Sequence, residues 1–143
     1  MTFKSSSLRR TKEIAALLAR EIRKSRKTGG AFVVALVGNL GSGKTAFVQG
    51  FAHGFGLKRR ITSPTFLVLR SYGRLHHIDA YRIRNLNELE VIGLKDIFED
   101  PRNVVLVEWA DRIKKVLPKD SLVVRFRHGR KLNERMISFG KIR

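Results

Sequence analysis

Eight consecutive residues carry the clearest chemical pattern in the sequence. They match G-x-x-x-x-G-K-[ST], in which glycines let the backbone come close to phosphate groups and turn its N–H groups toward them. The lysine supplies a positive charge for the β- and γ-phosphates, and the final hydroxyl is a ligand for Mg²⁺. We predict that the segment binds ATP and magnesium through Gly38, Asn39, Leu40, Gly41, Ser42, Gly43, Lys44 and Thr45.

Two carboxylates follow predicted strands and are candidates for holding magnesium or activating water. Glu108 comes directly after the apolar run 104–107, and Asp79 follows a second strand-like run. Because ligands bind at the carboxyl edge of open α/β sheets, Glu108 is expected to hold Mg²⁺ directly or through water, and Asp79 could order the magnesium waters or orient the attacking water. Glu108 could also be an ordinary strand-terminal carboxylate, and Asp79 could make a structural pair with Arg82 or Arg84.

A tryptophan, Trp109, directly follows the first of these carboxylates. At the edge of a sheet its ring could pack in the core, offer a stacking surface for a base, or close over the phosphate site. The sequence alone leaves these three roles open.

Hydrophobic patterning predicts the elements that position these residues. After a serine-rich start that could cap a helix, apolar residues recur at helical spacing at Ile14, Leu17, Leu18 and Ile22. Continuous apolar runs at 31–37 and 104–107 predict strands buried on both faces. The other predicted elements are a helix from about residue 44 that ends at Gly54 and Gly56, strands 66–69 and 75–78 around a turn at Gly73, helical residues 85–98 broken at Gly93, a short helix at 110–117, and strands 122–124 and 136–139.

This alternation of helices and strands indicates an α/β protein. We predict a P-loop NTPase-like three-layer sandwich, in which helices flank a central, mostly parallel (mixed) β-sheet. Residues 1–143 are predicted to form a single P-loop ATPase domain, because 143 residues fit one compact domain.

The chain is strongly basic. Thirty Lys and Arg residues oppose twelve Asp and Glu residues, which gives a formal net charge of +18. Such a surface attracts polyanions, and contact with tRNA, mainly through electrostatics, is one predicted use of it. A generally basic, solubilising surface is the alternative.

Composition also excludes several classes of protein. The sequence has no cysteine, which excludes disulfides, thiolate zinc sites and cysteine nucleophiles. Its longest apolar run, 31–37, is far shorter than the ~20 residues that span a bilayer. Because the N-terminus also lacks an apolar leader region, we expect a cytoplasmic protein without a membrane span.

Four motifs in one order resemble the TsaE family, also known as YjeE, the ATPase component of the bacterial machinery that makes N6-threonylcarbamoyladenosine in tRNA. Residues 38–45 are similar to its G-[DE]-L-G-[AS]-G-K-T loop, and 77–82 to its H-x-D-x-Y-R motif. The segment 63–66, Ser-Pro-Thr-Phe, and the Glu-Trp pair at 108–109 match two further family motifs. The resemblance spans roughly residues 7 to 135 and departs from the pattern at Asn39, where an acid is common, and at Ala110, where proline is common.

This resemblance implies roles in hydrolysis for matching residues. Lys44 and Thr45 would bind the phosphates and magnesium, and Glu108 would ligate magnesium or serve hydrolysis. Thr65, in the Ser-Pro-Thr-Phe segment, resembles a switch element that senses the γ-phosphate. Asp79 is carried over as a residue needed for activity.

Three further residues are carried over from the family toward the nucleotide. Trp109 is expected to be needed for activity and to contact the nucleotide. Thr11 matches a family position near the nucleotide, with a plain helix N-cap as the alternative. Arg135 is also expected to approach the nucleotide.

The resemblance also implies a function and partners. The chain would bind and hydrolyse ATP-Mg to drive or reset the complex of TsaD and TsaB, in which TsaD transfers the threonylcarbamoyl group to tRNA. It would be an ATP hydrolase with weak intrinsic activity that its partners raise. Two other classes stay open: a basic, nucleotide-switched RNA-binding protein, and a small-molecule kinase, although no lid insertion is evident between the predicted strands.

Overall fold

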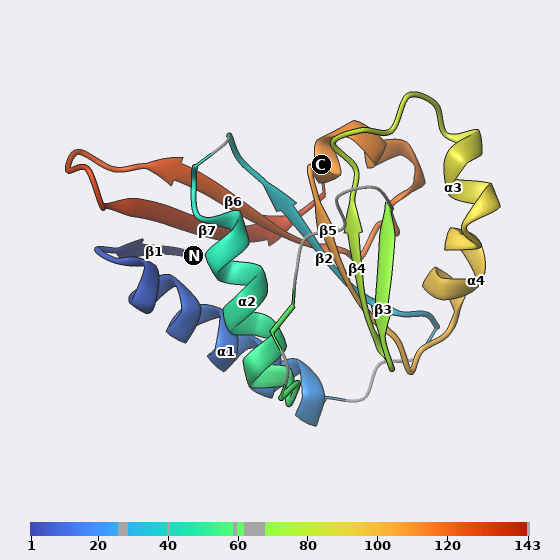
Figure 1. The fold of residues 1–143 in the computed structure, drawn as a ribbon, viewed down its shortest axis with the longest axis horizontal. Helices are drawn as coiled ribbons and strands as arrows, with labels where there is room; N and C mark the ends of the chain where they lie inside the picture. Colours follow the sequence, from blue (N-terminus) through green and yellow to red (C-terminus); the bar gives the residue numbers. More distant parts are fainter. Residues whose placement is uncertain (26–28, 40, 59, 62–67, 143) are drawn as a thin grey trace.

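The strands of the described residues form one seven-stranded sheet (Figure 1). The computed structural model describes residues 1–25, 29–39, 41–58, 60–61 and 68–142. In chain order the elements are β1 (Thr2–Ser5), α1 (Leu8–Lys24), β2 (Phe32–Val37), α2 (Lys44–Phe55), β3 (Leu69–Tyr72), β4 (Leu75–Asp79), α3 (Asn87–Val91), α4 (Leu94–Glu99), β5 (Val104–Glu108), the 3₁₀-helix η1 (Ala110–Val116), β6 (Leu122–His128) and β7 (Arg135–Lys141).

Parallel strands occupy the centre of this sheet. The strand order is β1-β7-β6-β2-β5-β4-β3, in which β6, β2, β5 and β4 run parallel. The outer strands β1, β7 and β3 extend the sheet by antiparallel pairing. The apolar runs of β2 and β5 lie side by side at the centre, because strands covered on both faces must be apolar throughout. The predicted mixed sheet with a parallel core is confirmed.

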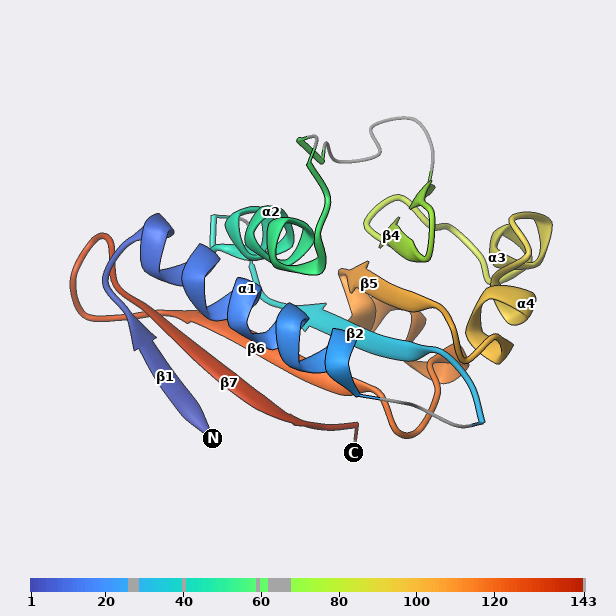
Figure 2. The same cartoon turned by 90° about the horizontal axis from the view of Figure 1, so that it is seen from below.

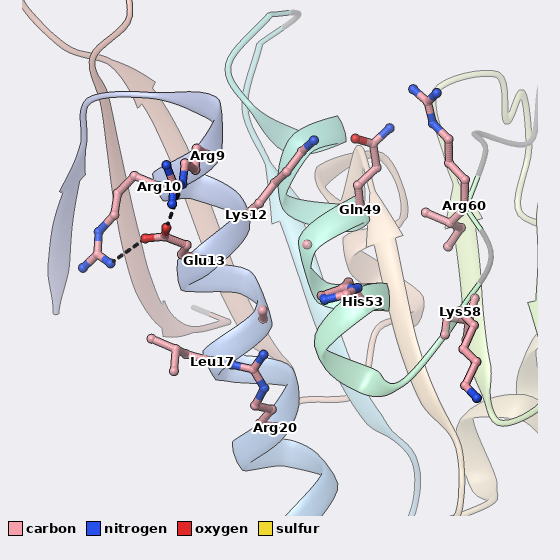
Figure 3. Close-up of a pocket in the computed structure, with 14 residues that line it drawn as sticks. Arg9, Arg10, Lys12, Glu13, Leu17, Arg20, Gln49, His53, Lys58 and Arg60 are labelled. Carbon is pink, nitrogen blue, oxygen red and sulfur yellow. Dashed lines mark hydrogen bonds and ion pairs between the residues drawn. The ribbon is translucent and has the colours of Figure 1, made fainter.

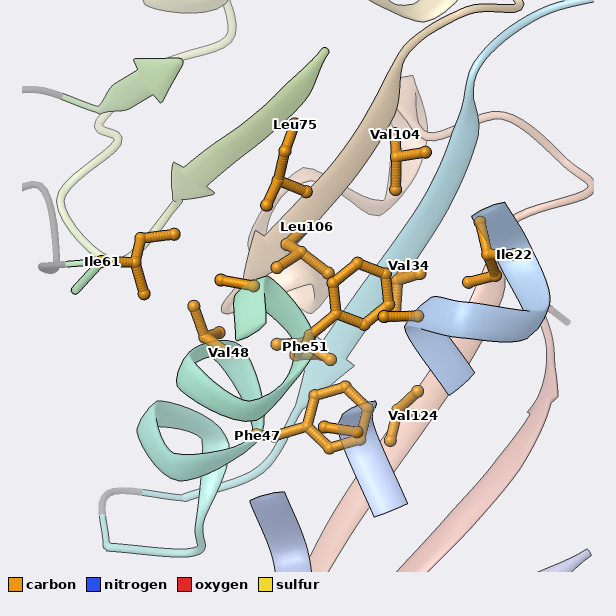
Figure 4. Close-up of a cluster of buried hydrophobic side chains, with 14 of the residues drawn as sticks. Ile22, Val34, Phe47, Val48, Phe51, Ile61, Leu75, Val104, Leu106 and Val124 are labelled. Atoms are coloured by element: carbon orange, nitrogen blue, oxygen red, sulfur yellow. The ribbon is translucent and has the colours of Figure 1, made fainter. Parts of the chain in front are cut away.

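Helices cover both faces of the sheet, and Figure 2 shows α1 and α2 together on one of them. Successive residues of β2 face opposite ways, as the two-residue repeat of a strand requires. Val34 packs in a cluster with Phe51 of α2 (Figure 4). Val33 belongs to a second cluster, with Leu89 of α3 and Ile113 of η1. The two cores on opposite faces confirm the three-layer sandwich.

Close contact between α1 and α2 depends on two glycines. A Cβ atom on Gly50 would come within 2.4 Å of the Lys12 backbone, and one on Gly54 would come equally close to the Ala16 backbone. Helix backbones can approach this closely only where a side chain is missing. Gly54 is therefore a helical residue of α2 at the contact with α1. The helix ends at Gly56, whose φ is 103°. This corrects the expectation that both glycines terminate it.

Other corrections fall at the margins of the fold. β1 has no counterpart among the predicted strands, because this short polar segment is held by its pairing with β7 rather than by an apolar pattern. β3 begins at Leu69, whereas the sequence predicts a strand over 66–69, of which 66–67 lie outside the described residues. Leu17, expected on the apolar face of α1, is 54% exposed.

Among the helices within the described ranges, none has both the length and the apolarity that a membrane crossing requires.

Candidate nucleotide site

The phosphate loop connects β2 to α2, as the sequence predicts. Gly41 and Gly43 have φ angles of 73° and 104°, in the left-handed region that favours glycine. A Cβ atom on Gly38 would lie 2.7 Å from the Ser42 hydroxyl, so a larger residue would push into the loop. Gly43 is the N-cap of α2 and offers no side-chain cap, which leaves the N–H groups of the first helical turn directed into the loop.

Lys44 lies at the bottom of the loop with its ammonium group enclosed. Its side chain donates to the carbonyl oxygens of Gly38 and Asn39. Its Nζ also lies 3.7 Å from the centroid of the Trp109 ring, a cation–π contact. Burial lowers the pKa of Lys44, although the nearby carboxylates of Glu108, Asp111 and Asp79 act in the opposite direction.

The two predicted carboxylates meet at the carboxyl edge of the sheet. Asp79 of β4 and Glu108 of β5 are register partners, which places them side by side on adjacent parallel strands. Asp79 Oδ1 accepts a hydrogen bond from the Tyr81 backbone N–H at 3.0 Å. Glu108 is only 6% exposed, so it requires a polar partner.

That partner is His77, which sequence reasoning missed as a functional residue. His77 Nε2 lies 2.7 Å from Glu108 Oε2, and both side chains are buried. The signal was present in the sequence, because His77 lies two residues before Asp79 and must share its face of β4. Its contact with Glu108 depends on the pairing of β4 with β5, which no local pattern reveals.

One cleft of about 370 Å³ collects most of the predicted site residues. The residues that line it are Leu8, Lys12, Gly41, Ser42, Gly43, Lys44, Thr45, Ala46, Gln49, Asp79, Glu108 and Trp109. The buried Ser42 Oγ has no hydrogen-bond partner among the described atoms, as expected of a hydroxyl directed at a ligand. A cradle of glycines, a lysine and an orphaned hydroxyl fits a phosphate chain.

The same cleft offers oxygen donors for magnesium. Thr45 is exposed at the start of α2, and the carboxylates of Asp79 and Glu108 line the same space. In the described part of the chain, no group of three or more His, Cys, Asp or Glu residues is arranged around a metal position. Mg²⁺ beside phosphates takes one or two protein ligands and completes its shell with phosphate oxygens and water, so these donors fit it.

Trp109, which lines the cleft, has a left-handed backbone conformation. Its φ and ψ are 55° and 40°. Among the described residues other than glycine, Trp109 alone has a positive φ. Its ring contacts that of Tyr81, with 4.9 Å between centroids, and the Arg112 guanidinium lies 5.0 Å from the Tyr81 centroid. A strained backbone of this kind costs about 1–3 kcal/mol and is found mainly where the structure holds a side chain for use.

Arg135 and Thr11 lie close to the loop but do not line the cleft. Arg135 Nη2 donates to the Gly41 carbonyl at 3.0 Å, which ties β7 to the phosphate loop. Thr11 is buried, and its hydroxyl lies 2.8 Å from the Ser5 hydroxyl. The N-cap of α1 is Ser7, so the alternative role of Thr11 as a helix cap is wrong. Leu40 and Thr65 lie outside the described residues.

Comparisons with known proteins agree on one family. The family model for threonylcarbamoyl adenosine biosynthesis protein TsaE matches residues 5–137. The tRNA threonylcarbamoyladenosine biosynthesis protein TsaE of Bacillus subtilis (strain 168) is 42% identical over 96 residues, which cover 64% of this chain and 59% of that protein. The same-named protein of Treponema pallidum (strain Nichols) is 40% identical over 98 residues, covering 66% of this chain and 72% of the relative.

A solved structure has the same fold. The crystal structure of Bacillus subtilis YdiB aligns with a TM-score of 0.79 at 30% sequence identity. The alignment covers 100% of this chain and 86% of that chain. The similarity therefore extends over the whole sheet as well as the loop. By sequence, however, the matched region spans less than two thirds of the length of the Bacillus subtilis TsaE relative.

Proposed function

This chain belongs to the TsaE family of tRNA threonylcarbamoyladenosine biosynthesis proteins, and we propose that its part in that modification is to bind and hydrolyse ATP with magnesium. The observation that carries the proposal is the shared cleft of Lys44, Thr45, Asp79 and Glu108 beneath the phosphate loop. These groups supply the charge, the hydroxyl and the carboxylates that phosphoryl transfer to water requires.

Each residue of the cleft would have a separate part in hydrolysis. The loop N–H groups and Lys44 would hold the phosphates and stabilise the negative charge that develops on the γ-phosphoryl group. Bound magnesium would neutralise phosphate charge, with Thr45 and Glu108 as its protein ligands. Asp79 would orient the attacking water from its place beside Glu108, with Thr65 as a sensor of the γ-phosphate. His77 would hold the Glu108 carboxylate in a fixed orientation.

Partners would complete the catalytic arrangement. From the family resemblance we propose that the chain docks on TsaD and TsaB in the cytoplasm, and that turnover of ATP drives or resets their threonylcarbamoyl-transfer complex. Arg135 Nη2 donates to the Gly41 carbonyl, which places this guanidinium beside the phosphate loop. We expect intrinsic hydrolysis by the single P-loop domain, residues 1–143, to be weak and to rise when partners complete the site.

The proposal is tested by measuring ATP hydrolysis by the purified chain alone and with TsaD, TsaB and tRNA, with Lys44→Ala as the control. Weak activity that rises with the partners and disappears in the variant would support a partner-activated ATPase. Fast turnover by the isolated chain would contradict the dependence on partners. Transfer of phosphate from ATP to a metabolite, rather than to water, would favour a kinase instead.

A further inference from the structure

A second hollow, a groove of about 940 Å³, lies along α1, α2 and the residues that follow α2 (Figure 3). The charged side chains that line this groove are mostly basic. Among the described residues that line it, Glu13 is the single acid, whereas the Lys and Arg residues are Arg9, Arg10, Lys12, Arg20, Lys58 and Arg60. We call this surface the basic groove.

Glu13 neutralises little of this charge. Its carboxylate lies between two arginines, 3.4 Å from Arg9 Nε and 3.3 Å from Arg10 Nη1. It therefore pairs with the arginines at one end of the groove and leaves the charges of Arg20 and Lys58 without an acidic neighbour in the lining. Guanidinium groups bind phosphate in a bidentate manner, which suits this surface to a chain of phosphates.

The two hollows on opposite faces of the sheet differ in charge. A hollow of about 800 Å³ beside α3 and α4 is lined by Glu90, Asp96 and Glu99, with Lys95 as its cation. These helices and α1–α2 pack in the two different cores, on opposite faces of the sheet. The basic groove therefore attracts polyanions more strongly than the hollow beside α3 and α4 does.

The basic groove adjoins the nucleotide cleft. Lys12 of α1 and Gln49 of α2 line both hollows. The glycine-mediated crossing of the two helices fixes the spacing of these side chains. The described lining contains no Phe, Tyr or Trp, and His53 is its single aromatic side chain. A nucleic acid in this groove would therefore be held mainly by its backbone.

We propose that the basic groove binds the phosphate backbone of tRNA, with one end of the bound segment next to the nucleotide cleft. This inference rests on the proposed function in taking the modified tRNA as the occupant. Because recognition is through phosphates, unmodified transcripts of tRNAs with different sequences should bind with similar affinity, and binding should weaken steeply with salt.

The test measures binding of a labelled tRNA transcript to the full chain by fluorescence anisotropy over a series of salt concentrations. The groove variant combines Arg20→Gln, Lys58→Gln and Arg60→Gln. Its matched control combines Lys114→Gln, Lys115→Gln and Lys119→Gln, which removes the same charge from exposed positions on and just after η1. The groove variant should bind tRNA about 10-fold or more weakly, with a salt slope lower by about 2 to 3, while the control retains wild-type binding.

Further measurements on these variants decide the inference. ATP hydrolysis should be unchanged in both variants, and tRNA binding should persist in Lys44→Ala, which separates this inference from the proposed function. Equal losses in the groove variant and its control would overturn the groove as a site, because net charge alone would then explain binding. Wild-type tRNA affinity in the groove variant, with weaker binding to the TsaD–TsaB complex, would assign the surface to an acidic protein partner and overturn the proposal.

Discussion

The nucleotide cleft and the basic groove share Lys12 and Gln49 but are built in different ways. The cleft is made by a loop and by strand ends, and its key groups Lys44 and Glu108 are buried. The groove is made by α1, α2 and the residues that follow α2, and its charges reach into solvent. A buried, preorganised group acts strongly on one ligand, whereas exposed charges act weakly and together. Single substitutions should therefore damage the cleft far more than the groove.

The largest expected effect is that of Lys44→Ala on the cleft. Loss of the buried ammonium group should lower ATP hydrolysis by about 100-fold or more, because it removes a preorganised charge from the transition state. Steady-state phosphate release measures it. Lys24→Ala, which changes an exposed lysine at the far end of α1, is the matched control and should have wild-type activity. Equal activity of the two variants would show that Lys44 is not needed for hydrolysis, and would contradict the expected difference between the cleft and the groove.

A smaller loss is expected from His77→Ala, which removes the partner of Glu108. Groups that orient a metal-ligating carboxylate typically contribute about 10- to 100-fold to metal affinity or activity, and we expect kcat or the magnesium requirement to change within that range. Titration of hydrolysis with Mg²⁺ distinguishes the two. His77→Gln keeps a hydrogen-bond donor and should recover part of the loss. If the two variants behave alike and only unfold more readily, His77 has a purely structural role.

Gly54→Ala tests the helix crossing beneath the groove. The added methyl group would meet the Ala16 backbone, so α1 and α2 must separate, at a cost of about 1–3 kcal/mol in the free energy of unfolding. Urea denaturation measures the change. Gly140→Ala is the control, since a Cβ there meets no heavy atom within 4 Å. Comparable stability of the two variants would show that the crossing tolerates a wider spacing and does not fix the groove.

The smallest expected effect concerns pH. Burial lowers the pKa of Lys44, so its ammonium group loses its proton at a lower pH than an ordinary lysine does. Phosphate binding needs the charged form, so affinity for ATP should fall with rising pH, and the fall should begin at a lower pH than an ordinary lysine would give. Calorimetric titration of ATP binding at a series of alkaline pH values measures the effect.

Asp111→Asn sharpens this pH prediction. Asp111 is one of the carboxylates that raise the pKa of Lys44, so its removal should move the fall in affinity to lower pH. An affinity that does not change with pH in either protein would mean that Lys44 stays charged throughout. tRNA binding by the groove arginines should not follow this profile, because guanidinium groups stay protonated.

Much of the fold could be predicted because its central elements have strong local patterns. The apolar runs of β2 and β5 indicate buried parallel strands, and Gly93, with φ of 75°, divides α3 from α4 as predicted. β1 could not be predicted, because a short exposed edge strand is defined by its partner β7. The exposure of Leu17 also follows from how α1 lies on the sheet and α2, which helical periodicity does not specify.

The sequence by itself determined the phosphate loop, because this geometry needs glycine, lysine and threonine at fixed spacing along one short segment. It also placed Asp79 and Glu108 at strand ends. Only the tertiary structure decided that His77 contacts Glu108, that Arg135 clamps Gly41, and that basic residues from α1 and from beyond α2 line one groove. The physical reason is the distance along the chain over which each feature is determined. The backbone conformation of a short loop is set by neighbours in sequence, whereas contacts between distant side chains depend on which elements pack together.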